Sequence, residues 1–528
     1  MIFLFVLSCH SPKMKDTVPP FQDVLLSDDV ILSEVQTCTN PSPNIHYQMY
    51  ELPIVENSNI NIHEHLDGGM IFVADFNQDG LLDIGNCFDL DSLYLYFGEE
   101  YSHDGISFSS YVHLSEDCSP SVVIDIDEDG DLDILRLSDK LQLFRNRLGE
   151  SLATTDQMLF SKENVSLPLS MAQLHGVPRG LKTGDINGDG IMDFFVPKSH
   201  PERRPASEDF VIVSRSLEEY DIQKTTNSDM ASRQAFDAVV WDNNQDGYDE
   251  VYVINDMGNF FGPNTMWNNV EGTLQPNNND CNCEITMSGM GVDIGDINRD
   301  GYLDFLLTDT NTNRVLQGDT EHSWFDVTHA MGANVLEDWE MSWGGIFVDI
   351  NNDGYLDILT AQGDLYYEGM IGSPYIGDMQ LHVLQQKHDM EHSYFEEVRS
   401  DIGLDVAYGS FRNVLTYDIN RDGIQDMIVT DIEKNPVVFL SEGCTAENWI
   451  EIEAPTGTWI EITTANGTYR SRVRNDSGFR ASISPRLWFG LEDLDSIDSI
   501  AYQIPRQDWE EISGPIATRR KIQIVRSK

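Results

Sequence analysis

The chain repeats an acidic run of the form DxNxDGxxD, and the residues of this run are hard oxygen donors. Side-chain oxygens stand at its first, third, fifth and ninth positions, and glycine stands at the sixth, where the chain must turn sharply. Calcium takes about six to eight oxygen ligands and tolerates irregular geometry, whereas zinc prefers the His and Cys side chains that these runs lack. The runs therefore predict Ca²⁺ sites. The alternative interpretation is a set of acidic turns on a solvated surface.

Each of the seven runs offers four side chains and the backbone carbonyl of its seventh residue as predicted structural Ca²⁺ ligands. In chain order the ligands are Asp75, Asn77, Asp79, Leu81 and Asp83; Asp125, Asp127, Asp129, Asp131 and Asp133; Asp185, Asn187, Asp189, Ile191 and Asp193; Asp242, Asn244, Asp246, Tyr248 and Glu250; Asp296, Asn298, Asp300, Tyr302 and Asp304; Asp349, Asn351, Asp353, Tyr355 and Asp357; Asp418, Asn420, Asp422, Ile424 and Asp426. The fourth run is the weakest match, because it has Asn243 where the others have Phe or Ile and ends in Glu250 rather than Asp.

The sequence on both sides of each run predicts β-strands. Segments such as IFVADF before the first run and LDILRL after the second are rich in residues that strands favour. An EF-hand begins with a similar loop, but it is flanked by helices and needs a glutamate at its twelfth position. These runs instead have Asn86, Arg136, Val196, Val253, Leu307, Thr360 and Val429 there. Each run is therefore predicted to join the two strands of a β-hairpin.

Successive runs begin 50 to 69 residues apart, so the chain is built from one repeated unit of short strands and turns. A repeat of this length favours a radial array of four-stranded sheets, which leaves few unpaired strand edges. We therefore predict an all-β protein, a seven-bladed β-propeller with calcium-binding hairpin loops, followed by a small C-terminal β module. Two packed sheets are the alternative, but such folds do not usually contain sevenfold internal copies.

These motifs resemble a known group of extracellular proteins. The DxNxDGxxD hairpins are similar to the FG-GAP, or VCBS, repeats of the integrin α propeller, and segments such as MGVDIGDINRDGYLDFLLTD resemble the cartilage acidic protein family more closely. The tail resembles the ASPIC/UnbV module of that family in SGF at residues 477–479 and in SPRLWFGL at residues 484–491. The resemblance implies a propeller that presents loops to a protein or glycan ligand outside the cell.

Charge divides the chain near residue 450. The whole chain has 33 basic and 89 acidic residues and a net charge of −56, whereas residues 451–528 contain equal numbers of each. The acidic excess lies in the first part, where it repels nucleic acid and anionic lipid, so neither is expected as a partner. We predict four segments: a signal peptide at 1–9, a tether and N-terminal segment at 10–54, the propeller at 55–450, and an ASPIC/UnbV-like module at 451–528.

The N-terminus and the cysteines both predict export. The apolar run MIFLFVLSC ends in a sequence that resembles a bacterial lipobox, with Cys9 as the lipid-bearing residue. We therefore expect a cell-surface or outer-membrane lipoprotein, attached to the membrane only through that lipid, or a secreted protein with an ordinary signal peptide. Six further cysteines permit three disulfides in an oxidising compartment. Fifteen pairings are possible and the sequence does not choose among them; one of these, Cys38–Cys444, would close the ring of blades.

The sequence offers little for catalysis, because it lacks the GxSxG, HExxH and glycine-rich nucleotide-binding motifs. His63, Glu64 and His65 could place two imidazoles on one side of a strand, although such a pair is more often a solvated edge. The favoured function is non-enzymatic recognition or adhesion. The alternative is an exported enzyme, or an accessory protein of a biosynthetic or surface-processing system, with its pocket at the mouth of the propeller channel. Convergent His, Arg and Glu side chains there would favour the enzyme, and an exposed aromatic patch would favour binding.

The tail carries a row of basic residues that predicts how it meets the propeller. Arg470, Arg472 and Arg474 alternate along one predicted strand, so their side chains lie on one face. We expect this face to dock onto the acidic propeller. A free basic patch for a partner is the alternative.

Overall fold

The computed structural model describes residues 24–526 except 28–29, 34–35, 37, 39–40, 43–44, 53–68, 88–91, 100–106, 149–158, 169–175, 201–207, 217–218, 226–232, 278–280, 311, 321–322, 335–339, 365–378, 390–391 and 433–434. The lipobox-like segment ending at Cys9 and the His63–His65 pair lie outside the described residues. Apart from a short helix α2 (Gly258–Phe261) and a 3₁₀ turn η3 (Leu404–Val406), the described elements are β-strands. None of the described helices has the length and apolar character that a membrane crossing requires.

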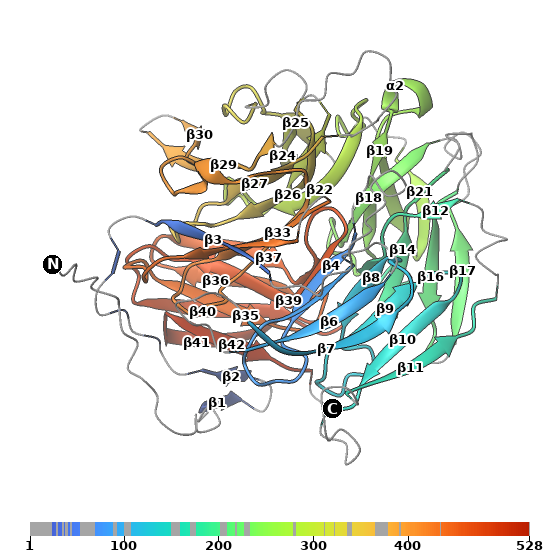
Figure 1. The fold of residues 1–528 in the computed structure, drawn as a ribbon, viewed down its shortest axis with the longest axis horizontal. Helices are drawn as coiled ribbons and strands as arrows, with labels where there is room; N and C mark the ends of the chain where they lie inside the picture. Colours follow the sequence, from blue (N-terminus) through green and yellow to red (C-terminus); the bar gives the residue numbers. More distant parts are fainter. Residues whose placement is uncertain are drawn as a thin grey trace, which may run out of the picture.

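Each acidic run lies in its own antiparallel meander of four strands (Figure 1). In chain order of the runs the meanders are β4 (Ile71–Ala74), β5 (Asp83–Asn86), β6 (Leu93–Gly98) and β7 (Phe108–Ser115); β8 (Ser121–Ile124), β9 (Asp133–Leu137), β10 (Leu141–Asn146) and β11 (Phe160–Val165); β13 (Lys182–Gly184), β14 (Asp193–Val196), β16 (Phe210–Ser214) and β17 (Tyr220–Lys224); β18 (Gln234–Trp241), β19 (Glu250–Asp256), β20 (Thr265–Val270) and β21 (Thr273–Pro276); β22 (Gly289–Gly295), β23 (Asp304–Asp309), β24 (Arg314–Thr320) and β25 (Ser323–Asp326); β26 (Ser342–Val348), β27 (Asp357–Gln362), β29 (His382–His388) and β30 (Ser393–Glu397); β32 (Phe411–Tyr417), β33 (Asp426–Asp431), β34 (Val437–Ser441) and β3 (Tyr47–Glu51). Two short pairs, β12 (Val177–Pro178) with β15 (Lys198–Ser199) and β28 (Met379–Gln380) with β31 (Tyr408–Gly409), complete the strands of this part.

The meanders stack face to face, and each inner strand is buried on both faces. Neighbouring residues of β14 show this, because Phe194 packs with Leu135 of the preceding meander and Phe195 packs with Val251 of the following one. Side chains alternate between the faces of a strand, so a strand between two sheets needs apolar residues at every position. The apolar runs beside each acidic motif meet this need. The fold is therefore all-β and propeller-like.

The N-terminal segment closes the array. Strand β3 pairs with β34 over Tyr47–Ser441 to Glu51–Val437, so the last meander takes its outer strand from the start of the chain. A disulfide joins Cys38 to Cys444 beside this strand pair, which is the pairing suggested by ring closure. Two more bonds, Cys87–Cys118 and Cys281–Cys283, use the other four cysteines of the described residues. The three disulfides indicate an oxidising, extracellular environment.

Removing the Cys38–Cys444 bond should destabilise the protein more than removing the Cys281–Cys283 bond. The first spans 406 residues and the second spans 2, and a cross-link restricts the unfolded chain more when it closes a longer loop. We expect Cys38→Ala/Cys444→Ala to lower the free energy of unfolding by about 2–4 kcal/mol, measured by urea denaturation. Cys281→Ala/Cys283→Ala is the matched control, and an equal loss in both variants would contradict the argument.

The tail forms a two-sheet module with its own core. One sheet contains β35 (Trp449–Glu453), β39 (Ala481–Gly490) and β42 (Arg520–Ile524), and the other contains β36 (Trp459–Thr464), β37 (Gly467–Arg472), β40 (Ser496–Gln503) and β41 (Glu510–Ala517). Buried Ile450, Ile460, Ile500 and Ile522 lie in the core between the sheets. Strands β1 (Val24–Ser27) and β2 (Val30–Leu32) extend the first sheet through β42. The segment at 10–54 thus contributes β3 to the last meander and β1 and β2 to the tail module.

Candidate calcium loops and the filled channel

The seven acidic runs share one backbone conformation. Each run connects the first and second strands of its meander, and its ninth residue begins the second strand, which confirms the predicted hairpins. The sixth-position glycine has a positive φ in every run, between 80° and 97°. The fourth residue is also left-handed, although it is glycine only at Gly188; the others are Gln78, Glu128, Gln245, Arg299, Asn352 and Arg421. Two left-handed residues so close together curl the chain around the carboxylates.

Backbone N–H groups hold the first and ninth carboxylates in place. In the first loop, Asp75 accepts hydrogen bonds from Asp79 N at 3.1 Å and Gly80 N at 2.7 Å. Asp83 accepts from Phe76 N at 2.8 Å and from Gly98 N, on the third strand, at 3.0 Å. The bond from the glycine to the first carboxylate recurs in the other six loops. So does the bond from the third strand to the ninth carboxylate.

The fourth loop, which matches the sequence pattern least well, has the same framework. Glu250 accepts hydrogen bonds from Asn243 N at 2.9 Å and from Asn269 N at 3.3 Å, as the ninth-position aspartates do elsewhere. Asp242 accepts from Asp246 N and Gly247 N. The longer Glu side chain and the polar second residue therefore leave the loop geometry unchanged.

The middle ligand positions also converge. Where the third residue is Asn, its Nδ2 donates to the fifth carboxylate at 2.7–3.0 Å. The fifth carboxylate also accepts the N–H of the seventh residue in all seven loops. All the predicted ligand residues are described, and those of one run lie in one loop.

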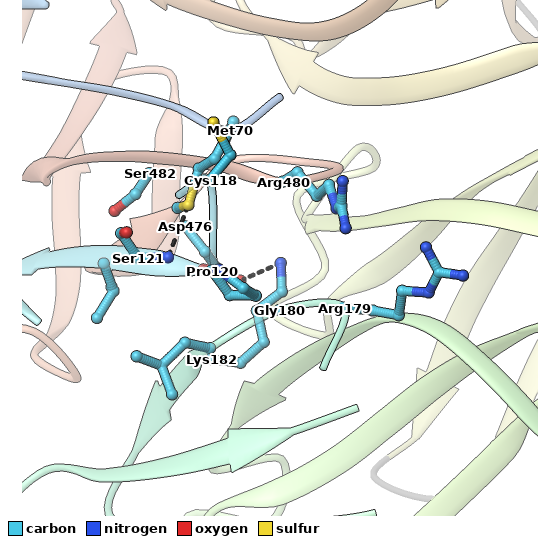
Figure 2. A pocket seen from close by; sticks show the side chains of 13 residues that line it. Met70, Cys118, Pro120, Ser121, Arg179, Gly180, Lys182, Asp476, Arg480 and Ser482 are labelled. Atoms are coloured by element: carbon cyan, nitrogen blue, oxygen red, sulfur yellow. Dashed lines mark hydrogen bonds and ion pairs between the residues drawn. The ribbon is translucent and has the colours of Figure 1, made fainter. Parts of the chain in front are cut away.

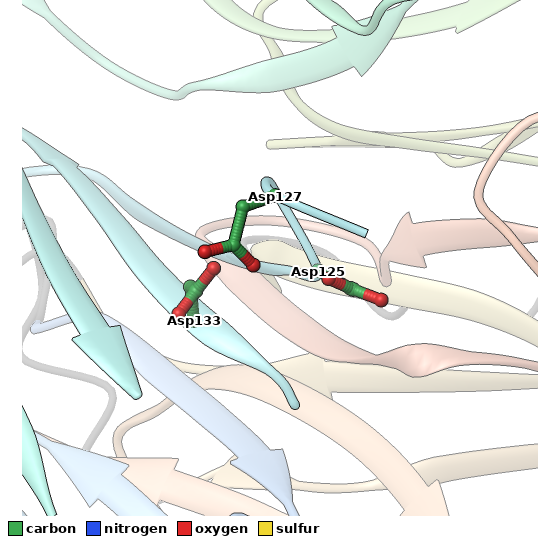
Figure 3. Close-up of side chains that lie close together, drawn as sticks. All are labelled: Asp125, Asp127 and Asp133. Atoms are coloured by element: carbon green, nitrogen blue, oxygen red, sulfur yellow. The ribbon is translucent and has the colours of Figure 1, made fainter. Parts of the chain in front are cut away.

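Figure 3 shows the second loop, where the third ligand is a carboxylate. Asp125, Asp127 and Asp133 each offer an oxygen, and these oxygens lie within 4.8 Å of one another. Oxygens bound to one Ca²⁺ at about 2.3–2.6 Å can be separated by at most about 5 Å, so the spacing fits one ion. The guanidinium of Arg145 forms an ion pair with Asp127. The sequence pattern gave no sign of this competing cation, because Arg145 comes from β10, outside the loop.

Several ligand oxygens are buried without a protein partner. Asp349 Oδ1, Asn351 Oδ1 and Asp127 Oδ1 accept no hydrogen bond within the described part of the chain. A buried oxygen without a partner costs about 1–3 kcal/mol, and two of these belong to one loop. Because a Ca²⁺ ion would be coordinated by such oxygens, the residues present fit the ion.

Burial also raises the pKa of the loop carboxyl groups. It raises the pKa of Asp83, Asp133, Glu250 and Asp304 to about 8, and that of Asp357 and Asp426 far above the ordinary range. The neighbouring carboxylates of each loop add to the shift. Groups with such pKa values are substantially protonated at neutral pH unless a cation stabilises their charge.

Residues 474–483 of the C-terminal module fill the space between the first strands of the meanders. Ala481–Ile483 of β39 pair in parallel with Ile71–Val73 of β4, near the middle of the array in Figure 1. The same segment contacts the other six first strands. Asn475 Nδ2 donates to Val123 O, and Lys182 Nζ donates to Gly478 O. The ring of Phe236 stacks on Phe479, and that of Trp343 lies tilted against it. Asp293 pairs with Arg474, and Asn413 donates to Phe479 O. The C-terminal module therefore contacts the first strand of every meander.

The arginine row docks onto the propeller through two of its three members. Arg472 donates to both carboxylate oxygens of Asp249 at 2.7 and 2.9 Å, and Arg474 pairs with Asp293. Arg470 instead lies 4.6 Å over the ring of Trp459, in its own module. The predicted docking is thus confirmed for Arg472 and Arg474. Arg470 forms no ion pair with a meander carboxylate within the described residues, because Trp459 of the neighbouring strand β36 supplies an aromatic face for it.

Figure 2 shows a pocket beside residues 474–483, the segment that we call the plug. Its lining includes Arg179, Arg480, Lys182 and Asp476, and its volume is about 20 Å³. Lys182 lies 2.8 Å from Asp237 and 3.4 Å from Asp476. A space of this size holds about one or two water molecules. Two arginines line this pocket, but no His or Glu does, so it lacks the convergent His, Arg and Glu side chains that would favour an enzyme.

Comparisons with known proteins give limited similarity. A family model for the FG-GAP-like repeat matches residues 242–307 and 296–360, which cover the fourth, fifth and sixth acidic runs. No curated protein matches the sequence. Solved structures with a similar fold include an Agrocybe aegerita lectin that recognises non-reducing terminal N-acetylglucosamine. It matches at 14% identity and a TM-score of 0.39, over 63% of this chain and 81% of that one.

Two further structures have similar scores. The BBS1N protein in complex with ARL6DN matches at 7% identity and a TM-score of 0.42, over 71% of this chain and 92% of that one. The Dos1 propeller matches at 9% identity and a TM-score of 0.40, over 79% and 92%. From the family match and the meanders together, the chain is an all-β, propeller-like protein that contains FG-GAP-like repeats.

Proposed function

We propose that the chain is an exported, seven-bladed β-propeller whose seven acidic loops each bind one structural Ca²⁺, and that it serves as an extracellular or cell-surface recognition protein. The observation that carries the metal assignment is the hydrogen-bonded framework common to the seven loops, together with the converging carboxylates of Asp125, Asp127 and Asp133 in the second loop. The unpartnered Asp349 and Asn351 oxygens support it.

The ligand we propose is a protein or a glycan. An aromatic group on β6 and β7 supports recognition, because Tyr94 contacts Tyr96, Tyr111 and His113 at ring distances of 5.0–6.2 Å. Tyr111 is 46% exposed, and aromatic side chains at a surface supply contact area for either kind of ligand. The small pocket beside the plug gives no comparable support to the enzymatic alternative.

The family and location of the protein are part of the same proposal. We assign residues 451–528 to an ASPIC/UnbV-like module and residues 55–450 to the propeller, with a lipid-bearing Cys9 or a cleaved signal peptide at the start. The disulfides support export. A pull-down from the surface fraction of the source organism, with and without calcium, tests the recognition role: capture by wild type but not by Tyr111→Ala is expected, and equal capture by both contradicts the aromatic surface.

Calcium stoichiometry tests the metal assignment. We expect wild-type protein, dialysed against millimolar calcium and analysed by elemental mass spectrometry, to hold about seven ions. Asp300→Asn should remove one ion, because the fifth carboxylate is a direct ligand and the exposed position tolerates the isosteric amide. Asp319→Asn, at an exposed position of β24 outside the loops, is the matched control. An unchanged count in Asp300→Asn, or fewer than one ion per wild-type chain, would contradict the assignment.

A further inference from the structure

The fourth residue of several acidic loops reaches the next loop along the chain. Gln78 Nε2 donates to Gly130 O at 3.1 Å, Arg299 Nε donates to Gly354 O at 3.0 Å, and Asn352 Nδ2 donates to Gly423 O at 2.7 Å. The acceptor is the sixth-position glycine each time. Three different side chain types thus make the same connection between neighbouring loops, which the variable fourth position of the motif did not reveal.

Asn352 makes the most complete of these connections. Its side chain is buried, and its left-handed backbone has a φ of 58°. While Nδ2 bonds the following loop, Oδ1 accepts a hydrogen bond from the indole of Trp488 in the C-terminal module at 2.8 Å. Its carbonyl also accepts from Glu492 N at 2.9 Å. One residue therefore joins two acidic loops and the tail.

The bonded glycine lies between predicted ligands of the next loop. Gly423 follows Asp422 and precedes Ile424, and its N–H donates to Asp418 at 3.0 Å. The hydrogen bond from Asn352 therefore orients the Gly423 carbonyl, and with it the backbone between the predicted ligands Asp422 and Ile424. Loss of the Asn352 bond would leave this turn free to reorient, and ordering it again would oppose ion binding.

We propose that Asn352 is a positioning residue that couples Ca²⁺ binding between the 349–357 and 418–426 loops, so that occupancy of one raises the affinity of the other. This inference rests on the proposed function, because it requires both loops to bind the ion. Coupling of this kind is reciprocal. It also extends to the C-terminal module through Trp488, which stacks on Trp449 with ring centroids 4.4 Å apart.

Trp449 provides a local signal for the second of the two loops. Its indole lies directly against Gly423, where even a Cβ atom would meet it. Terbium replaces calcium in oxygen-ligand sites and emits when a nearby indole is excited, so the part of the emission that Trp449→Phe removes reports on the 418–426 loop. The difference between wild type and Trp449→Phe is needed because Trp488 donates to Asn352 and Trp241 donates to Asn243, so other acidic loops also have an indole close by.

The test compares two variants with the same backbone change. Asn352→Gly removes both side-chain bonds and keeps the positive φ without strain. The control, Gln245→Gly, changes the fourth residue of the 242–250 loop. The Gln245 side chain is exposed and, within the described residues, forms no hydrogen bond to the next loop. We expect Asn352→Gly to weaken terbium binding at the 418–426 loop about three- to tenfold. Gln245→Gly should match wild type. Equal midpoints for Asn352→Gly and wild type would overturn the inference.

A double-variant cycle tests the coupling itself. Asp353→Asn weakens the 349–357 loop, and we expect it to shift the Trp449-sensitised midpoint in wild type but not in Asn352→Gly. The same shift in both backgrounds would overturn the relay through Asn352 while leaving the calcium sites in place. Failure of wild type to bind terbium or calcium at all would overturn the proposed function together with this inference.

Discussion

Chelation of calcium should lower the melting temperature of the protein by about 10 °C or more. At a dissociation constant of about 10⁻⁴ M in roughly millimolar calcium, each site contributes about 1.4 kcal/mol, and seven independent sites contribute about 10 kcal/mol. Unfolding a chain of this length has an entropy of about 1 kcal/mol per degree, which converts the loss to the stated shift. The measurement is a thermal melt in calcium and in EDTA.

The burial of the loop carboxylates is the reason why we expect so much stability to depend on the ion. The ninth carboxylates are buried between backbone donors, and the first carboxylates face them across the loop. Without a cation, these groups must either protonate or repel one another. Restoring calcium should restore the melting temperature, whereas equimolar magnesium should not, because it gives up its water reluctantly. A melting curve that EDTA leaves unchanged would contradict structural calcium.

Breaking the ion pairs of the arginine row should release the C-terminal module from the propeller. Arg472 and Asp249 are both nearly fully buried, with side-chain exposures of 4% and 2%, and Arg474 is mostly buried against Asp293. Removing one partner of a buried pair leaves a charge without compensation and costs about 3–5 kcal/mol. We expect Arg472→Gln/Arg474→Gln to show that loss in denaturant unfolding and to become sensitive to limited proteolysis at the junction near residues 445–455.

Arg470→Gln is the matched control for this experiment. It lies on the same strand as Arg472, but its guanidinium stacks on Trp459 instead of pairing with a propeller carboxylate. We expect it to retain wild-type resistance to proteolysis. Unchanged cleavage of the double variant would rule out docking through these pairs.

The local chemistry of the protein was readable from its sequence. The spacing of oxygen donors, the glycine at the sixth position and the apolar flanks predicted hairpin loops because these features depend on a few neighbouring residues. The sequence did not choose among the fifteen possible cysteine pairings, but the Cys38–Cys444 bond suggested by ring closure is present in the structure. The sheets and loops follow from periodicity that recurs along the chain.

Contacts between distant segments were decided only by the tertiary structure. Residues 474–483 lie between the first strands, strand β2 joins the tail sheet, and Asn352 bonds Gly423 and Trp488. The sequence singled out Arg474 and the SGF segment at 477–479 but not their partners, and it gave no sign of the role of Asn352, because a side chain at a variable motif position acquires its partner only when two loops are brought together. Sequence thus determined which groups can bind a cation, and packing determined which of them touch, because contact between remote residues depends on the whole arrangement of the sheets.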